Sequence, residues 1–152
     1  MAPRGSYGNV RLSPDGSRLA LTHVVTYGSE RLALLTVTQP DAPLFYLTPD
    51  NSMAEYPRWS GDGQKIYCAY QPQDAASLQI HEIEVATGRI SALPLGVAAK
   101  TTAPFPTPDD QGLFFQTGKD GKSTLAYWSR QTGKVIDLDL GRSATEPFYF
   151  IP

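Results

Sequence analysis

The stretch "PRWSGDGQKIYCAY" (57–70) decides the fold, because a tight polar turn leads at once into an apolar strand and the chain repeats this pattern. Its part "WSGDGQKIYCAY" aligns without gaps with "LSPDGSRLALTH" (12–23) and "PTPDDQGLFFQT" (106–117). A period of about 20 to 50 residues is typical of stacked, similar supersecondary units. The sequence therefore predicts a repeat architecture.

Two markers set the register of the repeat. The aspartates of the three turns, Asp15, Asp62 and Asp109, are each 47 residues apart. The Thr-Gly pair of "TGRI" (87–90) returns 45 residues later in "TGKV" (132–135). Because both markers recur, the match is not confined to one turn.

The sequence of each copy indicates four short strands. The Ser-Pro-Asp-Gly type of turn suits a tight connection between the first two strands. The second strand is almost continuously apolar, as expected where both of its faces are covered. The third strand alternates more, and in the second copy the alternation shifts phase between Ile80 and Ile83, which predicts a bulge or a twist to an outer position. No segment has a sustained helical period.

The pattern P-x-W-S-x-D-G-x-x-I, followed by T-G-[RK]-[IV], resembles the TolB-like subgroup of WD40-like propeller repeats over roughly residues 9–140. The resemblance implies an all-β fold, a partial β-propeller of three four-stranded antiparallel blades plus the start of a fourth. The blades are predicted at about 9–48, 55–95 and 102–140, with the further blade beginning at 146–152. We treat 1–152 as one partial propeller domain.

The third copy departs from the pattern at two positions. Pro106 stands where the second copy has Trp59, and Asp110 stands where it has Gly63. We therefore expect its turn to be less regular. We also expect Asp62→Ala to destabilise the protein more than Asp110→Ala, because Asp62 caps its turn and Asp110 fills a glycine-like position.

Composition excludes some classes of partner. Lys and Arg number 13 against 15 Asp and Glu, and no basic stripe stands out, so no nucleic-acid or membrane contact by this region is expected. The single cysteine, Cys68, excludes an intrachain disulfide and a multi-cysteine zinc site. No apolar run is long enough to span a bilayer.

The residues that could do chemistry favour structural roles. The turn aspartates could form a ring of cation ligands, but their spacing is that of the repeat, which favours turn capping. His23 and His81 have no neighbouring ligand cluster, and Cys68 takes a position that is leucine or phenylalanine in the other copies. We therefore expect neither a metal nor a cofactor.

A serine hydrolase is the enzyme class to consider, because propellers of prolyl-oligopeptidase-like enzymes resemble these repeats. Its Gly-x-Ser-x-Gly motif is absent, since "GRSAT" (141–145) lacks the second glycine. We expect no catalytic residues and no enzymatic activity in this chain.

A binding surface is expected at the rim formed by the loops between the second and third strands and the linkers between blades. These loops vary most in length and chemistry, and loops on a rigid scaffold commonly carry recognition residues. A protein or small ligand is expected to contact Tyr27, Asn51, Met53, Gln71, Lys100, Lys119 and Lys122.

The resemblance implies a non-enzymatic binding or sensor module of a larger protein, such as the sensory part of a bacterial regulator or a periplasmic interaction platform. It favours a periplasmic or other extracytoplasmic location. The alternatives are an accessory propeller that gates a prolyl-oligopeptidase-like serine peptidase, and a structural spacer. A three-blade stack would leave two apolar faces uncovered. We therefore expect either a homodimer that closes a ring or a continuation into further blades past Pro152, and we favour the continuation.

Overall fold

The computed structural model describes residues 5–26, 28–96, 103–119 and 122–138. This part contains strands and no helix, which confirms the all-β prediction. The strands of the first group are β1 (Ser6–Leu12), β2 (Arg18–Thr26), β3 (Ser29–Thr36) and β4 (Phe45–Tyr46). The second group has β5 (Met53–Trp59), β6 (Lys65–Gln71), β7 (Gln79–Glu84) and β8 (Ile90–Ala92). The third has β9 (Phe105–Pro106), β10 (Gly112–Lys119), β11 (Lys122–Ser129) and β12 (Val135–Leu138). The predicted start of a further blade, 146–152, lies outside the described residues.

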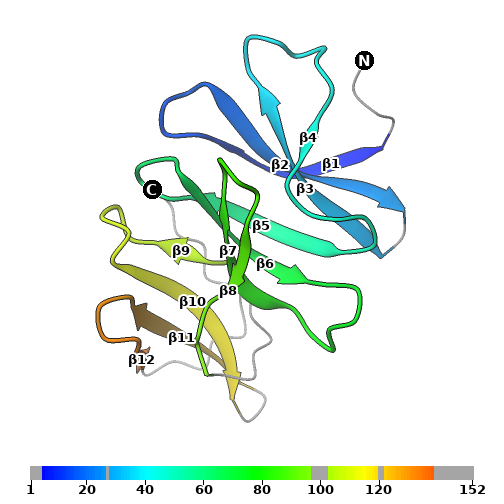
Figure 1. Cartoon of the computed structure of the whole chain (residues 1–152). Coiled ribbons are helices and arrows are strands. Elements are labelled where there is room, and N and C mark those ends of the chain that lie inside the picture. The colour runs from blue at the N-terminus through cyan, green and yellow to red at the C-terminus, as the bar shows by residue number, and fades with distance from the viewer. Residues whose placement is uncertain (1–4, 27, 97–102, 120–121, 139–152) are drawn as a thin grey trace.

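Each group is one blade, a four-stranded antiparallel sheet whose strands pair in chain order. Figure 1 shows the three blades stacked one after another, with the chain passing from the first blade at the top to the third at the bottom. The first strands lie along one side of the stack, where β1 contacts β5 and β5 contacts β9. We call β1, β5 and β9 the inner strands.

The first two blades also share a main-chain link. Glu30 of β3 pairs in parallel with Met53 of β5, and the Glu30 N–H donates to the Ser52 carbonyl at 3.0 Å. This link joins the two blades into one eight-stranded sheet.

The turn aspartates cap their turns, as the sequence predicts. Asp15 accepts hydrogen bonds from the Ser13 hydroxyl at 2.6 Å and the Ser17 N–H at 3.0 Å. Asp62 repeats both contacts with Ser60 (2.6 Å) and Gln64 (3.0 Å). These bonds favour the ionised carboxylate, so they lower the pKa of Asp15 to about 2. They also lower the pKa of Asp62.

The third turn is as regular as the others, so the expectation of irregularity was wrong. Thr107 replaces serine and donates to Asp109 at 2.6 Å, and Asp109 also accepts from the Gln111 N–H at 3.1 Å. Asp110 has a left-handed φ of 58°, and Gly63 at the equivalent position has a φ of 70°. Aspartate tolerates this conformation because its short polar side chain can hydrogen-bond nearby.

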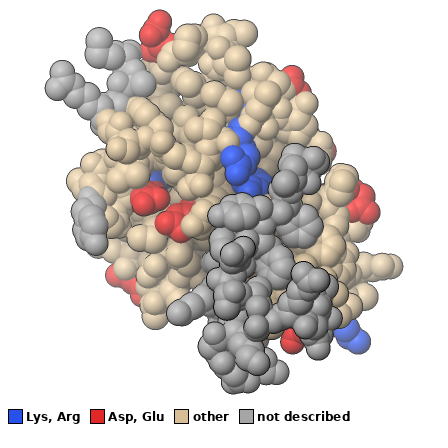
Figure 2. Space-filling model, turned by 180° about the vertical axis from the view of Figure 1, so that it is seen from behind, with Lys and Arg blue, Asp and Glu red and all other residues tan. Residues whose placement is uncertain are grey.

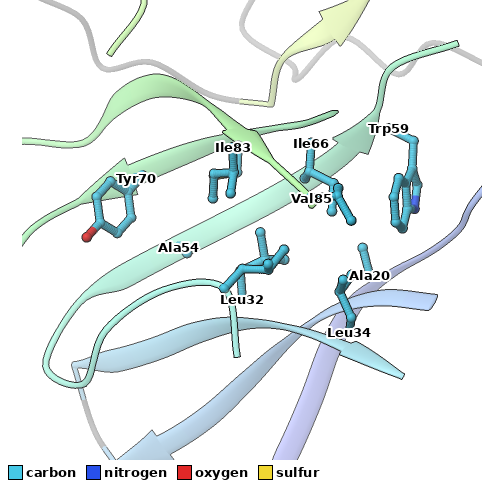
Figure 3. Packing of buried hydrophobic residues seen from close by; sticks show 11 residues of the cluster. Ala20, Leu32, Leu34, Ala54, Trp59, Ile66, Tyr70, Ile83 and Val85 are labelled. Carbon is cyan, nitrogen blue, oxygen red and sulfur yellow. The ribbon is translucent and has the colours of Figure 1, made fainter. Parts of the chain in front are cut away.

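The core of the first interface lies between the first and second blades. Figure 3 shows Ala20, Leu32 and Leu34 of the first blade facing Ile66, Ile83 and Val85 of the second. Trp59 completes this cluster, and its indole N–H donates to the Arg11 carbonyl of β1 at 3.0 Å. Trp59 and the apolar strand after it therefore form a packing surface, as predicted.

A second core joins the second blade to the third. Tyr67 and Ile80 of the second blade pack here against Leu113, Phe115 and other buried residues of the third. Cys68, on the opposite face from Tyr67, is fully buried in the first core, and burial raises the pKa of its thiol to about 12. It is an inert core residue, as expected.

The predicted bulge between Ile80 and Ile83 is absent. β6 and β7 pair without interruption from Lys65 opposite Glu84 to Tyr70 opposite Gln79. Ile83 belongs to the core shared with the first blade and Ile80 to the core shared with the third. The apparent phase shift arises because both faces of this strand are buried, so that apolar residues occur at odd and even positions alike.

A polar network crosses the second interface. The Tyr67 hydroxyl donates to the Asp110 carboxylate and accepts from Arg130 Nη2 at 2.7 Å. Arg130 also pairs with Glu82 at 2.8 Å, and Lys65 approaches the same carboxylate at 3.5 Å. Asp110 fills a glycine-like position, as predicted, but its carboxylate also joins two blades.

The outer two blades present apolar side chains on the faces turned away from the second blade. Leu12 is 57% exposed beside its strand partner Leu19, and Ile136 is 54% exposed beside Tyr127. The described residues therefore agree with two incompletely covered faces. Homodimerisation and continuation into further blades both remain predictions.

The two tryptophans allow a matched test of the first interface. Each ring lies 5.3 Å from a guanidinium carbon, Arg18 over Trp59 and Arg130 over Trp128. Trp59 has a hydrogen bond, whereas the buried Trp128 N–H has no partner among the described residues. We expect Trp59→Phe to lower the free energy of unfolding by about 1 kcal/mol more than Trp128→Phe. Urea denaturation checks this, and equal losses would contradict a role for the indole hydrogen bond.

We also expect the reverse of the initial ranking for the two aspartates. Asp110→Ala removes the acceptor of the Tyr67 hydroxyl and places alanine at a left-handed φ, so it should cost about 2 kcal/mol and more than Asp62→Ala. Urea denaturation of both variants gives the order. In a Tyr67→Phe background, Asp110→Ala should cost less, and an unchanged cost there would show that the network contributes nothing.

The capped turns predict a loss of stability in acid. The folded-state pKa of Asp15 lies below its ordinary value of 3.8, so the unfolded chain binds more protons in this range. The stabilisation is therefore present above pH about 4 and is lost as the pH falls towards about 2. Asp15→Asn keeps an acceptor and does not titrate. Its urea midpoint should fall less between pH about 5 and about 2 than that of the wild type, and parallel curves would refute the argument.

Candidate functional site

Three of the predicted contact residues meet at one end of the second blade. Met53 begins β5, where it pairs with Gln71 of β6 and with Glu30 of β3. Asn51 is exposed two residues earlier, with a left-handed φ of 58°. We call the end formed by Asn51, Met53 and Gln71 the rim.

The rim is held by local hydrogen bonds. The Ser52 hydroxyl donates to the Pro49 carbonyl at 2.8 Å, which closes the turn that presents Asn51. Gln71 Nε2 donates to the Ala75 carbonyl at 2.7 Å and so orders the loop after β6. These bonds fix the backbone, whereas Asn51 stays exposed and Met53 and Gln71 are half-buried.

The other predicted contact residues are described in part or not at all. Tyr27 and Lys100 lie outside the described residues. Lys119 and Lys122 are strand partners at the hairpin between β10 and β11, where the structure describes their backbones only. The structure therefore brings together three of the seven residues and leaves the association of the other four as a prediction.

Glu30 and Glu55 form an acidic pair next to the rim, which the sequence analysis did not predict. Burial and the charge of Glu30 raise the pKa of the Glu55 carboxyl. Burial and the charges of Glu55 and Glu30 also raise the pKa of Tyr56. Glu30 and Glu55 therefore place two like charges close to Met53.

The inner strands carry a second feature that sequence reasoning missed. The pairing of β1 with β2 shifts between Gly8 and Arg11, and that of β5 with β6 shifts between Glu55 and Arg58. In each bulge one residue has a left-handed φ, 50° at Asn9 and 54° at Tyr56. Non-glycine residues in this region carry backbone strain, and bulges commonly redirect the residue that follows.

Arg11 and Arg58 follow these two bulges and have similar surroundings. Arg11 Nη1 donates to the preceding carbonyl of Val10 at 2.7 Å, and Arg58 Nη1 does the same to Pro57 at 3.1 Å. The Arg58 guanidinium also lies 4.9 Å from the ring centroid of Phe105 on β9. We call Arg11, Arg58 and Phe105 the inner-strand triad.

The electrostatics of the two arginines are unusual. Burial and the neighbouring charge of Arg11 lower the pKa of Arg58 to about 10. Within the described ranges, neither guanidinium forms an ion pair with a carboxylate. Figure 2 shows Lys and Arg side chains together near the centre of the face seen from behind.

The sequence held a signal for the inner-strand triad. Arg11, Arg58 and Phe105 are 47 residues apart, the same spacing as the turn aspartates. In a stack of blades, equal repeat positions lie side by side on neighbouring units. A prediction that rests on the variable loops does not include these positions.

Both histidines are buried structural residues. His23 is 2% exposed, shares a hydrogen bond of 2.7 Å with the Tyr46 hydroxyl through Nδ1 and stacks on Tyr7. His81 Nδ1 lies 3.1 Å from the Gln79 carbonyl, and burial lowers the pKa of His81. In the described part of the chain, no group of three or more potential metal ligands occurs.

A cleft of about 510 Å³ lies at the hairpin end of the first interface, away from the rim. Its lining residues are Arg18, Asp62, Gly63, Gln64, Lys65, Glu84, Val85 and Ala86. Lys65 approaches Glu82, Glu84 pairs with Arg89, and Arg18 lies over the Trp59 ring. Because these charges already have partners, the cleft is a weaker candidate than the rim or the triad.

No described helix is long and apolar enough to cross a membrane.

Comparison with known proteins identifies the fold. No protein-family model and no curated protein matches the sequence. Among solved structures, TolB from Acinetobacter baumannii superposes with a TM-score of 0.70 and 20% identity, covering 87% of this chain and 31% of that protein. The β-propeller domain of the Trilobed protease from Pyrococcus furiosus, which has an open velcro topology, gives 0.61 and 17% identity, covering 90% and 43%. A prolyl endopeptidase gives 0.57 and 18% identity, covering 83% and 21%.

These similarities show that the chain has the fold of a TolB-like β-propeller and supplies three of its blades. The chain spans less than half the length of each of these three proteins. Their identity with this chain is low, so the fold is what they share with it.

Proposed function

We propose that this chain is a non-enzymatic binding module of a larger TolB-like propeller protein, and that it takes a protein or small-ligand partner at the rim. The observation that carries the proposal is the convergence of Asn51, Met53 and Gln71 at the end of paired strands. A sensory role and an extracytoplasmic location, which the sequence resemblance favours, belong to the same proposal.

The rim combines a backbone held by strand pairing with an exposed side chain. Met53 is held by strand pairing to both Gln71 and Glu30, so the rim does not need to become ordered when a partner binds. A half-buried methionine offers an adaptable apolar contact, and the exposed Asn51 offers an amide beside it. The neighbouring Glu30 and Glu55 add negative charge, which favours a partner with a basic group.

A second candidate function is the gating of a peptidase. The observation in its favour is that the structures similar to this chain include a prolyl endopeptidase and a protease propeller domain. In that prolyl endopeptidase, inter-domain dynamics have a role in catalysis and specificity. A serine peptidase domain in the full-length protein would favour this candidate over a sensor.

The rim is tested by selecting peptides from a random display library and measuring their binding to purified variants. We expect Met53→Ala and Gln71→Ala to weaken binding by about tenfold, since contacts at the centre of an interface contribute most. Lys134→Ala, at an exposed position in the hairpin between β11 and β12, is the control and should bind like the wild type. Selected peptides that bind all four proteins equally would overturn the assignment of the rim.

A further inference from the structure

We propose that the inner strands of the first two blades form an oxyanion-binding site, in which Arg11 and Arg58 hold a carboxylate or phosphate group. The site lies roughly 15 Å from Met53 along β5 and does not depend on the function proposed for the rim.

The positions of the two arginines support such a site. Arg11 and Arg58 occupy the same repeat position on adjacent inner strands, each directly after a bulge with one left-handed residue. The indole of Trp59 donates to the Arg11 carbonyl, so the residue after Arg58 is fixed to the backbone of Arg11. Equivalent bulges therefore place the two arginines at matching positions on neighbouring strands.

The charges of Arg11 and Arg58 also support an anion site. Two guanidinium groups repel each other, and partial burial of Arg58 increases the free energy of its charged form. Elsewhere in the described chain, arginines beside carboxylates pair with them, as Arg31 does with Asp50 and Arg130 with Glu82. Arg11 and Arg58 have no such partner among the described residues, although the protein as a whole carries a net charge of -2. A bound anion would compensate both charges.

The chemistry of the ligand follows from the donors. A guanidinium has five N–H donors in a fork that matches the oxygens of a carboxylate or phosphate. In both arginines, the bonds to described residues use Nη1 alone. The Phe105 ring, 4.9 Å from the Arg58 guanidinium, supplies an apolar surface beside it. The site therefore suits an oxyanion attached to a small apolar body, carried by a free acid or by an acidic peptide.

The test titrates the ¹⁵N-labelled chain with inorganic phosphate and, separately, with malonate at constant low ionic strength in chloride. Arginine side-chain and inner-strand amide resonances should move and saturate. Arg58→Gln and Arg11→Gln should each weaken binding about tenfold or more, since each removes a charge-assisted bidentate contact. Arg89→Gln removes the same charge at an exposed hairpin position and should bind like the wild type.

The outcomes separate the possibilities. Tighter binding of malonate assigns a carboxylate ligand and tighter binding of phosphate assigns a phosphate ligand, and an acidic peptide that competes with malonate assigns the carboxylate to a peptide. Arg58→Lys keeps the charge without the fork and should bind weakly even if Arg58→Gln does not fold. No saturable change with either anion, or equal binding by wild type, Arg11→Gln and Arg58→Lys, would overturn the proposal. Loss of peptide binding at the rim would leave this result untouched.

Discussion

The second blade is buried on both of its faces, and the rest of the structure depends on this constraint. Ile66 and Ile83 face the first blade, whereas Tyr67 and Ile80 face the third. A sheet sandwiched in this way cannot keep a polar face, so its strands become apolar at odd and even positions alike. Polar groups at the two interfaces must then find partners across the blade boundary or remain without one.

The two interfaces satisfy that requirement differently. Between the first and second blades, the Trp59 indole N–H donates to the Arg11 carbonyl and the Glu30 N–H donates to the Ser52 carbonyl, beside an apolar core. Between the second and third blades, Tyr67, Asp110, Arg130 and Glu82 form a hydrogen-bonded network at the edge of the apolar core. A network of this kind specifies one relative position of the blades, because each member depends on the others for its partners.

The same stacking creates the two candidate sites. It sets strand ends side by side at the rim, where Glu30 of one blade pairs with Met53 of the next. It also sets equal repeat positions next to each other on β1 and β5, where the charge of Arg11 helps to lower the pKa of Arg58. The inner-strand triad spans three blades, and Met53 of the rim pairs with Glu30 of the preceding blade, so a single repeat would reproduce neither arrangement.

The sequence by itself determined the repeat, the capped turns and the blade architecture, because these are local patterns that recur with a fixed spacing. Asp15, Asp62 and Asp109 show this, since each binds atoms within two residues of itself. Only the tertiary structure decided what lies across the blade boundaries. From the sequence, Asp110 was only a substitute for glycine, whereas in the structure it accepts the hydroxyl of Tyr67 from the second blade. The phase shift at Ile80 suggested a bulge, whereas in the structure Ile80 packs into the core shared with the third blade. The physical reason is that the side-chain contacts of Trp59 and Asp110 between blades join residues 48 and 43 positions apart, and no local pattern records which side chains meet there.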